Sequence, residues 1–161
     1  MNTWLKFLLF LVPAVATTLY VLWRFSPEQT IIRRVDVLFT CLEKTTLSAG
    51  TPSEKAERFQ EALAPTLTIR APHPVESGTI RPARAGQMLK DFQNSITSCK
   101  ISREDESVNF PTEDHAIYEA TISAEITQGP GRKYPMRYRC RIEFKRSGRD
   151  WLAETIVLTP V

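Results

Sequence analysis

The chain has 161 residues, with 21 Lys and Arg against 18 Asp and Glu and a formal net charge of +3. This weak basic excess argues against a nucleic-acid partner, because nucleic-acid-binding proteins usually carry a larger and more clustered positive charge. The three cysteines form no C-x-x-C motif and the two histidines, His73 and His115, are isolated. We therefore expect neither a metal site nor a bound cofactor.

An uncharged run of seventeen residues, Phe7–Trp23, lies close to the N-terminus. At 1.5 Å per residue, a helix of this length covers roughly 25 Å, close to the ~30 Å hydrocarbon core of a bilayer. We therefore predict a signal-anchor or transmembrane segment at 1–25, which contacts the membrane through residues 4–23. The remaining residues, 26–161, have the length of one domain.

Two other interpretations of the N-terminus remain open. The triplet Ala14-Val15-Ala16 follows a basic start and an apolar run, as at the end of a cleaved signal peptide, so the chain could be secreted after cleavage following Ala16. The segment could also be a buried helix of the domain. We favour an uncleaved anchor in a bacterial inner membrane with the domain in the periplasm, because a short basic tail before one apolar segment is the usual signal-anchor arrangement.

The first two helices of the domain begin with similar capping signals. Ser26-Pro27-Glu28-Gln29 precedes apolar residues at helical spacing, which predicts a helix over 27–45. Thr51-Pro52-Ser53-Glu54 starts a second helix, which we expect to continue to Ala64 and to end before Pro65.

A short strand is predicted over 67–71 and a third helix from Pro82 to near Thr97. The helix is indicated by an apolar stripe at i, i+4, i+7 and i+11, formed by Ala85, Leu89, Phe92 and Ile96.

After Ser98 the hydrophobic period changes from helical to alternating. Apolar residues occupy the even positions of 116–127 and of 134–145, and polar residues occupy most of the odd positions. This alternation predicts a long hairpin with one buried face. With further strands at 99–108 and 151–158, we expect a four-stranded antiparallel meander plus the early short strand.

The order of elements resembles that of the nuclear transport factor 2-like superfamily, which includes the SnoaL-like and cystatin-like groups. The resemblance covers residues 27–158 and includes the closing strand Gly148-Arg-Asp-Trp-Leu-Ala-Glu-Thr-Ile156. It implies an α+β fold in which three N-terminal helices pack on a curved antiparallel sheet, here preceded by one transmembrane helix. It says little about function, because the superfamily contains isomerases, dehydratases, carriers and scaffolds.

Enzymes of this superfamily place acid–base groups between the helices and the concave face of the sheet. On that face of the hairpin we expect no Asp or Glu, so we assign no catalytic residue. Pocket candidates for ligand binding are Tyr118, Tyr138 and Trp151, together with His73, which lies near the end of the early strand where superfamily isomerases carry an acidic base.

The opposite face of the hairpin carries Arg137, Arg139 and Arg141 at alternate positions. We interpret this stripe as a solvated outer face on which Glu119 or Glu125 pairs with the arginines across strands. An acidic protein or a lipid headgroup is the alternative partner.

The cysteines Cys41, Cys99 and Cys140 are expected to be buried free thiols. A Cys99–Cys140 disulfide is not expected, because the strand at 116–127 lies between the two cysteines and separates their Cα atoms by more than a disulfide can span.

These observations predict a membrane-anchored, non-catalytic binding or assembly module of a bacterial cell envelope. Two alternatives are a SnoaL-like enzyme or carrier with an apolar pocket, and a subunit of a secretion or pilus machine. The partners that we expect are the membrane, an envelope protein and a second copy of the chain, because the superfamily often dimerises through the sheet face.

Overall fold

A computed structural model of the chain describes residues 3–73, 75 and 77–161, and for residues 3–11 it describes the backbone alone. The chain divides into two units, Met1–Thr30 and Ile31–Val161. The first unit contains helix α1, Thr3–Arg24. The side chains described in this helix, from Val12 onward, are all exposed.

The structure does not support the predicted transmembrane helix. Within the described part of the chain, no helix is both long and apolar enough to cross a membrane. The first residues of the predicted anchor, 4–11, lie outside the residues whose side chains are described. The anchor therefore stays a prediction and is argued further below.

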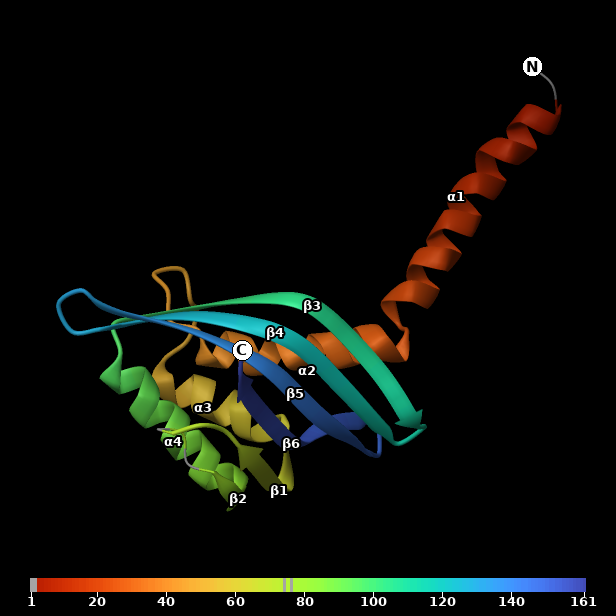
Figure 1. Cartoon of the computed structure of the whole chain (residues 1–161). Helices are drawn as coiled ribbons and strands as arrows, with labels where there is room; N and C mark the ends of the chain where they lie inside the picture. Colours follow the sequence, from red (N-terminus) through yellow and green to blue (C-terminus); the bar gives the residue numbers. More distant parts are fainter. Residues whose placement is uncertain (1–2, 74, 76) are drawn as a thin grey trace. The chain divides into compact units, whose positions relative to one another are not determined.

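The elements that follow are α2 (Pro27–Leu42), α3 (Pro52–Glu61), β1 (Leu63–Arg70), β2 (Gly78–Ile80), α4 (Pro82–Ser95), β3 (Ser98–Thr112), β4 (His115–Gln128), β5 (Arg132–Ser147) and β6 (Asp150–Pro160). The long strands β3, β4 and β5 lie side by side and curve together, and α3 and α4 lie on one side of them (Figure 1). The predicted α+β class is confirmed.

The strands form one sheet in the order β2-β1-β6-β5-β4-β3. The predicted meander is confirmed, since β3, β4, β5 and β6 pair consecutively and antiparallel. The expectation of a wholly antiparallel sheet is wrong, because β1 pairs parallel with β6. In the sequence, β1 and β6 are separated by β2, α4 and the strands β3 to β5, so the order of the elements alone could not show this pairing.

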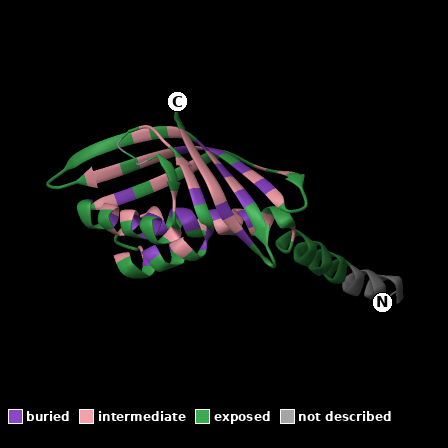
Figure 2. Cartoon of the chain, turned by 90° about the horizontal axis from the view of Figure 1, so that it is seen from below, coloured by how far each residue is buried: buried purple, intermediate pink, exposed green. Residues whose placement is uncertain are grey.

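The buried core follows the predicted alternation. The even-numbered residues Ala116, Tyr118, Ala120 and Ile122 of β4 are buried, as are Cys140, Ile142 and Phe144 of β5. They join one cluster with the apolar stripe of α2, which includes Ile31, Val35 and Leu38. Figure 2 shows the buried residues where helices and sheet face each other. One face of the hairpin is thus covered by helices, as the period of two predicted.

The capping signal at Thr51 is confirmed in detail. The Glu54 backbone N–H donates to Thr51 Oγ1 over 3.2 Å, and the Thr51 backbone N–H donates to Glu54 Oε2 over 2.7 Å. The hydrogen bond from the Thr51 backbone N–H to the carboxylate, followed by the interaction of the carboxylate with the Thr51 side chain, lowers the pKa of the Glu54 carboxyl. The helix ends at Glu61, earlier than predicted, and the chain enters β1 at Leu63, so Pro65 lies in a strand. The β1–β6 pairing shifts register between Leu63 and Thr68, around this proline.

Polar side chains close the C-terminal end of α2. Gln93, which is 1% exposed, donates to the carbonyl oxygens of Cys41 and Leu42 over 3.1 and 2.7 Å. The buried Lys55 ammonium donates to the Glu43 carbonyl oxygen. Because the last carbonyls of a helix have no intrahelical partner, these contacts fix α2 to α3 and α4.

Candidate functional site

A polar cluster lies between α2 and the β3 edge of the sheet. The Tyr118 hydroxyl donates a 2.8 Å hydrogen bond to Glu106 Oε2, and Arg103 Nη2 donates a 2.6 Å bond to Asp36 Oδ1. Arg103 Nη1 lies 3.3 Å from the same Glu106 oxygen. The Arg103 guanidinium also lies over the Phe39 ring, 5.4 Å from its centroid. One cation thus contacts two carboxylates, and one buried phenol contacts one of them.

The position of Glu106 depends on a break in the β3–β4 register. Pairing shifts between Glu104 and Ser107, and Asp105 between them has a φ of 55°. Asp tolerates this left-handed conformation better than most residues. The extra residue reverses the alternation of β3, so that Arg103 and Glu106 both reach the side of Tyr118.

The expectation that this face carries no acidic group is therefore wrong for Glu106. Strict alternation places Arg103 and Glu106 on opposite faces, and only the bulge brings them together. The sequence did contain a signal, since the polar run Arg103-Glu104-Asp105-Glu106 breaks the alternation of β3.

The cluster keeps its hydrogen-bonding groups in fixed protonation states. Burial, followed by the hydrogen bond to Glu106 and the charge of that carboxylate, raises the pKa of the Tyr118 phenol well above its usual range. Burial opposes the charge on Arg103, but the hydrogen bond to Asp36 and the charge of Glu106 outweigh it and raise the pKa of the guanidinium. Tyr118 is consequently a hydrogen-bond donor and Arg103 a cation at physiological pH.

The structure does not bring the four predicted pocket residues to one point. Tyr118 is fully buried, Tyr138 is half-buried with its hydroxyl 3.6 Å from Met136 Sδ, and Trp151 is buried with its ring 5.9 Å from that of Phe110. His73 is exposed, in the loop between β1 and β2.

The spacing along the sheet follows from the register. Tyr138 pairs with Ile122, which is four residues from Tyr118 on β4, so the two tyrosines are on the order of 13 Å apart along the strand. Trp151 pairs with Arg146, four residues from the Tyr118 partner Ile142 on β5, in the opposite direction. The three aromatic residues thus mark successive positions along one face.

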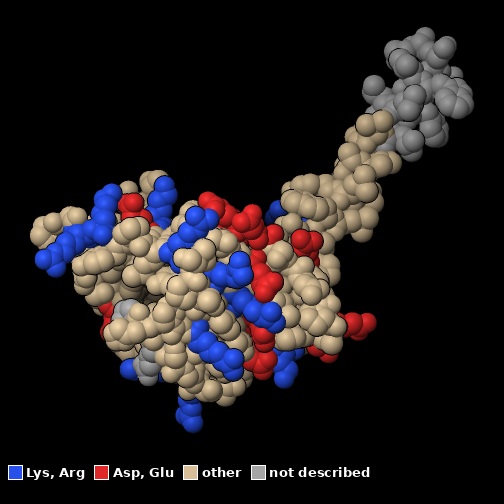
Figure 3. Space-filling model, viewed as in Figure 1, with Lys and Arg blue, Asp and Glu red and all other residues tan. Residues whose placement is uncertain are grey.

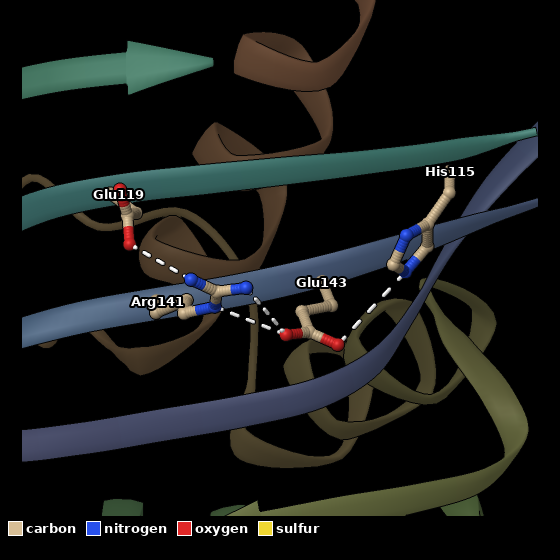
Figure 4. A network of polar contacts seen from close by, with 4 residues as sticks. All are labelled: His115, Glu119, Arg141 and Glu143. Carbon is tan, nitrogen blue, oxygen red and sulfur yellow. Dashed lines mark hydrogen bonds and ion pairs between the residues drawn. The ribbon is translucent and has the colours of Figure 1, made fainter. Parts of the chain in front are cut away.

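The outer face of the hairpin has the cross-strand pair predicted for Glu119, whereas Glu125 lies opposite Pro135 and contacts Lys133. Glu119 pairs with Arg141, and their side chains form a 3.3 Å ion pair. Arg141 also contacts Glu143 at 3.1 Å, and His115 Nε2 lies 4.0 Å from the second Glu143 oxygen (Figure 4). This network places His115 on the face away from the helices.

The three cysteines are free and buried. Burial, followed by the charge of Glu43, raises the pKa of the Cys99 thiol to about 11, and burial raises that of Cys140 to about 12. In the described part of the chain, no group of three or more His, Cys, Asp or Glu side chains could hold a metal ion.

Known structures identify the fold. An NTF2-like protein from Cytophaga hutchinsonii superposes with a TM-score of 0.65 at 12% identity, over 85% of this chain and 100% of that one. A type 2 hexachlorocyclohexane dehydrochlorinase gives 0.65 at 9% identity, over 83% of this chain and 87% of that one. The CaMKII hub of S. rosetta gives 0.62 at 13% identity, over 84% and 98%.

The chain has the nuclear transport factor 2-like fold. Neither family models nor curated proteins match the sequence. The structures with this fold include both a dehydrochlorinase and a hub, each at low sequence identity to this chain. The fold alone therefore does not distinguish a catalytic function from an assembly function.

Proposed function

We propose that this chain is a membrane-anchored, non-catalytic binding or assembly module of a bacterial cell envelope. The observation that carries the proposal is the run of exposed apolar side chains in α1 and just after it. Leu19, Leu22, Trp23 and Phe25 are 62%, 65%, 58% and 69% exposed. Such a continuous apolar surface is costly in water and is typical of a segment that lipid or another protein covers.

Further features of α1 suit an apolar environment. The hydroxyls of Thr17 and Thr18 donate to the carbonyl oxygens of Pro13 and Ala14 over 2.6 and 2.8 Å, so neither needs water. Tyr20 and Trp23 contact each other near the end of the helix, with ring centroids 6.2 Å apart. Aromatic pairs at this position are common where a helix leaves the hydrocarbon region.

The polar cluster of the domain favours binding over acid–base catalysis. General acid–base catalysis is most effective when a group has a pKa near the working pH. The pKa values of Tyr118 and Arg103 are instead raised further from neutrality. Their contacts with Glu106 and Asp36 hold the β3 edge and α2 together. A scaffold protein needs a rigid arrangement of this kind to present a surface to its partner.

For location and partners, we propose an inner-membrane protein with its domain in the periplasm. A neighbouring envelope protein, including one in a secretion or pilus machine, is the expected partner. A homodimer through the outer sheet face is also proposed, since one structure with this fold is a hub. If this homodimer forms, Arg139→Glu should lower the mass that sedimentation measures for the protein from that of a dimer toward that of a monomer.

The anchor is tested with the full chain in bacterial membranes. Wild type is expected in the carbonate-resistant membrane fraction at its intact mass, and Leu19→Asp with Leu22→Asp should shift it toward the soluble fraction. Val75→Asp with Val161→Asp, which changes two exposed apolar side chains outside α1, is the matched control. Wild type in the soluble fraction would refute the anchor, and a mass corresponding to residues 17–161 would show cleavage after Ala16.

A SnoaL-like enzyme or carrier is the second candidate. It is favoured by the Tyr118–Glu106 hydrogen bond on the helix-facing side, beside an Arg103 side chain that is 24% exposed. A small ligand that binds there should raise the melting temperature of wild type more than that of Tyr118→Phe. If apolar ketones and lipids give equal shifts with both proteins, this candidate fails at the proposed site.

A further inference from the structure

β3 is an outermost strand of the sheet, and the two halves of its free edge are covered differently. In the first half, the main chains of Lys44 and Cys99 exchange two hydrogen bonds, at 2.8 and 2.9 Å. The Glu43 carboxylate accepts a 3.2 Å hydrogen bond from the Ile101 backbone N–H. The segment that follows α2 therefore closes this half of the edge to pairing with another chain.

The second half of the edge is open. Among the described residues, none outside β4 hydrogen-bonds to the main chain of residues 102–112. Cys99 and Ile101 direct their main-chain groups outward, and the register shift of one residue that follows gives Val108 and Phe110 the same direction. The side chains of Val108 and Phe110 pack against the core cluster. The strand is therefore held in place while these N–H and C=O groups stay available.

The open half of the edge is acidic. Residues 104–114 contain five Asp or Glu and no Lys or Arg. Glu104 and Glu106 are paired with arginines of the domain. Asp105 and Glu113, at either end of the open half, are exposed and form no ion pair among the described residues. Figure 3 shows Asp and Glu side chains along the middle of β3 and near its C-terminal end. Negative charge is thus available beside the unpaired main chain.

This charge opposes pairing of the edge with a second copy of itself. An antiparallel pair that sets Val108 opposite Phe110 of the other copy also brings Asp105 close to Glu113 of that copy, twice in the symmetric pair. Like charges that face each other across strands are destabilising, whereas opposite charges stabilise the pair. The edge therefore suits a strand that carries positive charge.

We propose that residues 105–113 of β3 are a docking edge for an extended, basic segment of a partner protein. The segment adds to the sheet as a further strand and exchanges main-chain hydrogen bonds with Val108 and Phe110. Lys or Arg side chains near its two ends pair with Asp105 and Glu113. The inference deepens the proposed binding function by naming the chemistry of the partner, and it does not depend on the proposed anchor.

The test uses the full-length protein in a neutral detergent and the peptide Lys-Lys-Thr-Val-Thr-Val-Thr-Val-Lys-Lys at millimolar concentration. Hydrogen exchange of the Val108 and Phe110 amides, measured by NMR, should slow roughly twofold to fivefold when the peptide binds. A peptide with Glu in place of every Lys should have no effect, because it lacks the complementary charge. A peptide with Pro in place of every Val should also have no effect, because proline has no N–H to donate.

A pair of double variants separates the edge from a general charge effect. Asp105→Asn with Glu113→Gln should raise the Kd of the basic peptide roughly threefold to tenfold, because two cross-strand ion pairs are lost. Asn tolerates the φ of 55° at position 105 as Asp does. Glu57→Gln with Glu61→Gln changes the charge equally on the exposed face of α3 and should leave the Kd unchanged. Circular dichroism checks that both variants fold.

Unchanged exchange at Val108 and Phe110 with the basic peptide would overturn the proposal, as would equal slowing with the acidic or the proline peptide. Equal effects of the two double variants would show general charge attraction and overturn it too. Slowing that needs no peptide and rises with protein concentration would identify a second copy as the occupant instead. Failure of the proposed anchor is seen separately, in the membrane fractionation, because the peptide test requires no bilayer.

Discussion

At the scale of single residues, the contacts of Tyr118 show how a polar group is tolerated in the core. Its side chain is fully buried, yet its hydroxyl reaches Glu106, which is paired with Arg103. A buried hydroxyl without a partner would lose its interaction with water at a cost of roughly 1–3 kcal/mol. The bulge at Asp105 supplies that partner.

Tyr118→Phe is expected to lower the free energy of unfolding by about 1–2 kcal/mol, because it removes a hydrogen bond to a charged acceptor. Tyr138→Phe is the control, since among the described residues the Tyr138 hydroxyl bonds only to a thioether sulfur at 3.6 Å, and its loss should cost less than about 0.5 kcal/mol. Urea denaturation measures both. Equal effects of the two substitutions would contradict the structural importance of the Tyr118–Glu106 bond.

The buried thiols predict a dependence of stability on alkaline pH. Burial raises the folded-state pKa of Cys140 from 9.0 to about 12. The stability that the neutral thiol contributes is therefore fully present below pH 9 and is lost as the pH rises toward 12, because only the unfolded chain ionises in that range. Cys140→Val should therefore lose less stability than wild type between pH 9 and 12, measured by urea denaturation at each pH. Parallel stability curves for the two proteins would show that this thiol does not contribute.

At the scale of elements, α3 and α4 approach closely at Gly86. A Cβ at this position would lie 2.0 Å from Gln60 Nε2 and 2.7 Å from Gln60 Cγ. The glycine is therefore required by packing, although it lies inside a helix where alanine is intrinsically better.

Gly86→Ala should destabilise the protein by about 1–2 kcal/mol, because the Gln60 side chain must move away from the added Cβ. In a Gln60→Ala background the same substitution should instead be neutral or stabilise by up to about 1 kcal/mol through helix propensity. A thermal-denaturation cycle of the four proteins measures this change of sign. The same effect in both backgrounds would exclude the close approach as its cause.

At the scale of the whole molecule, the core cluster begins at Ile31 and ends at Ala153. α1 contributes no residue to this cluster among those described. A fragment that starts at residue 26, the domain boundary predicted from the sequence, therefore contains all of α2. It also keeps the 3.3 Å hydrogen bond from the Gln29 backbone N–H to Ser26 Oγ at the start of that helix.

A fragment of residues 26–161 should unfold cooperatively with a midpoint close to that of the full chain, because it retains every residue of the core cluster. A fragment of residues 36–161 lacks the fully buried Ile31 and Val35 and should lose several kcal/mol, at about 2–4 kcal/mol for each large buried side chain. Urea denaturation of both fragments tests the boundary. Cooperative unfolding of the shorter fragment alone would place the boundary elsewhere.

The sequence by itself determined most of the elements, their order and the buried face of the hairpin, but not the short strand β2. These features follow from local physics, since alternation, helical spacing and capping act between residues close in the chain. The cross-strand pair of Glu119 and Arg141 was predictable for the same reason, because a hairpin turn sets the register.

Only the tertiary structure decided the parallel pairing of β1 with β6 and the cluster around Arg103. Both join segments that are far apart in sequence, and the cluster also depends on one extra residue at Asp105. A single bulge reverses the alternation of a strand, so a pattern of period two cannot locate the side chains beyond it. The described surface of α1 keeps the apolar character that its uncharged sequence predicted.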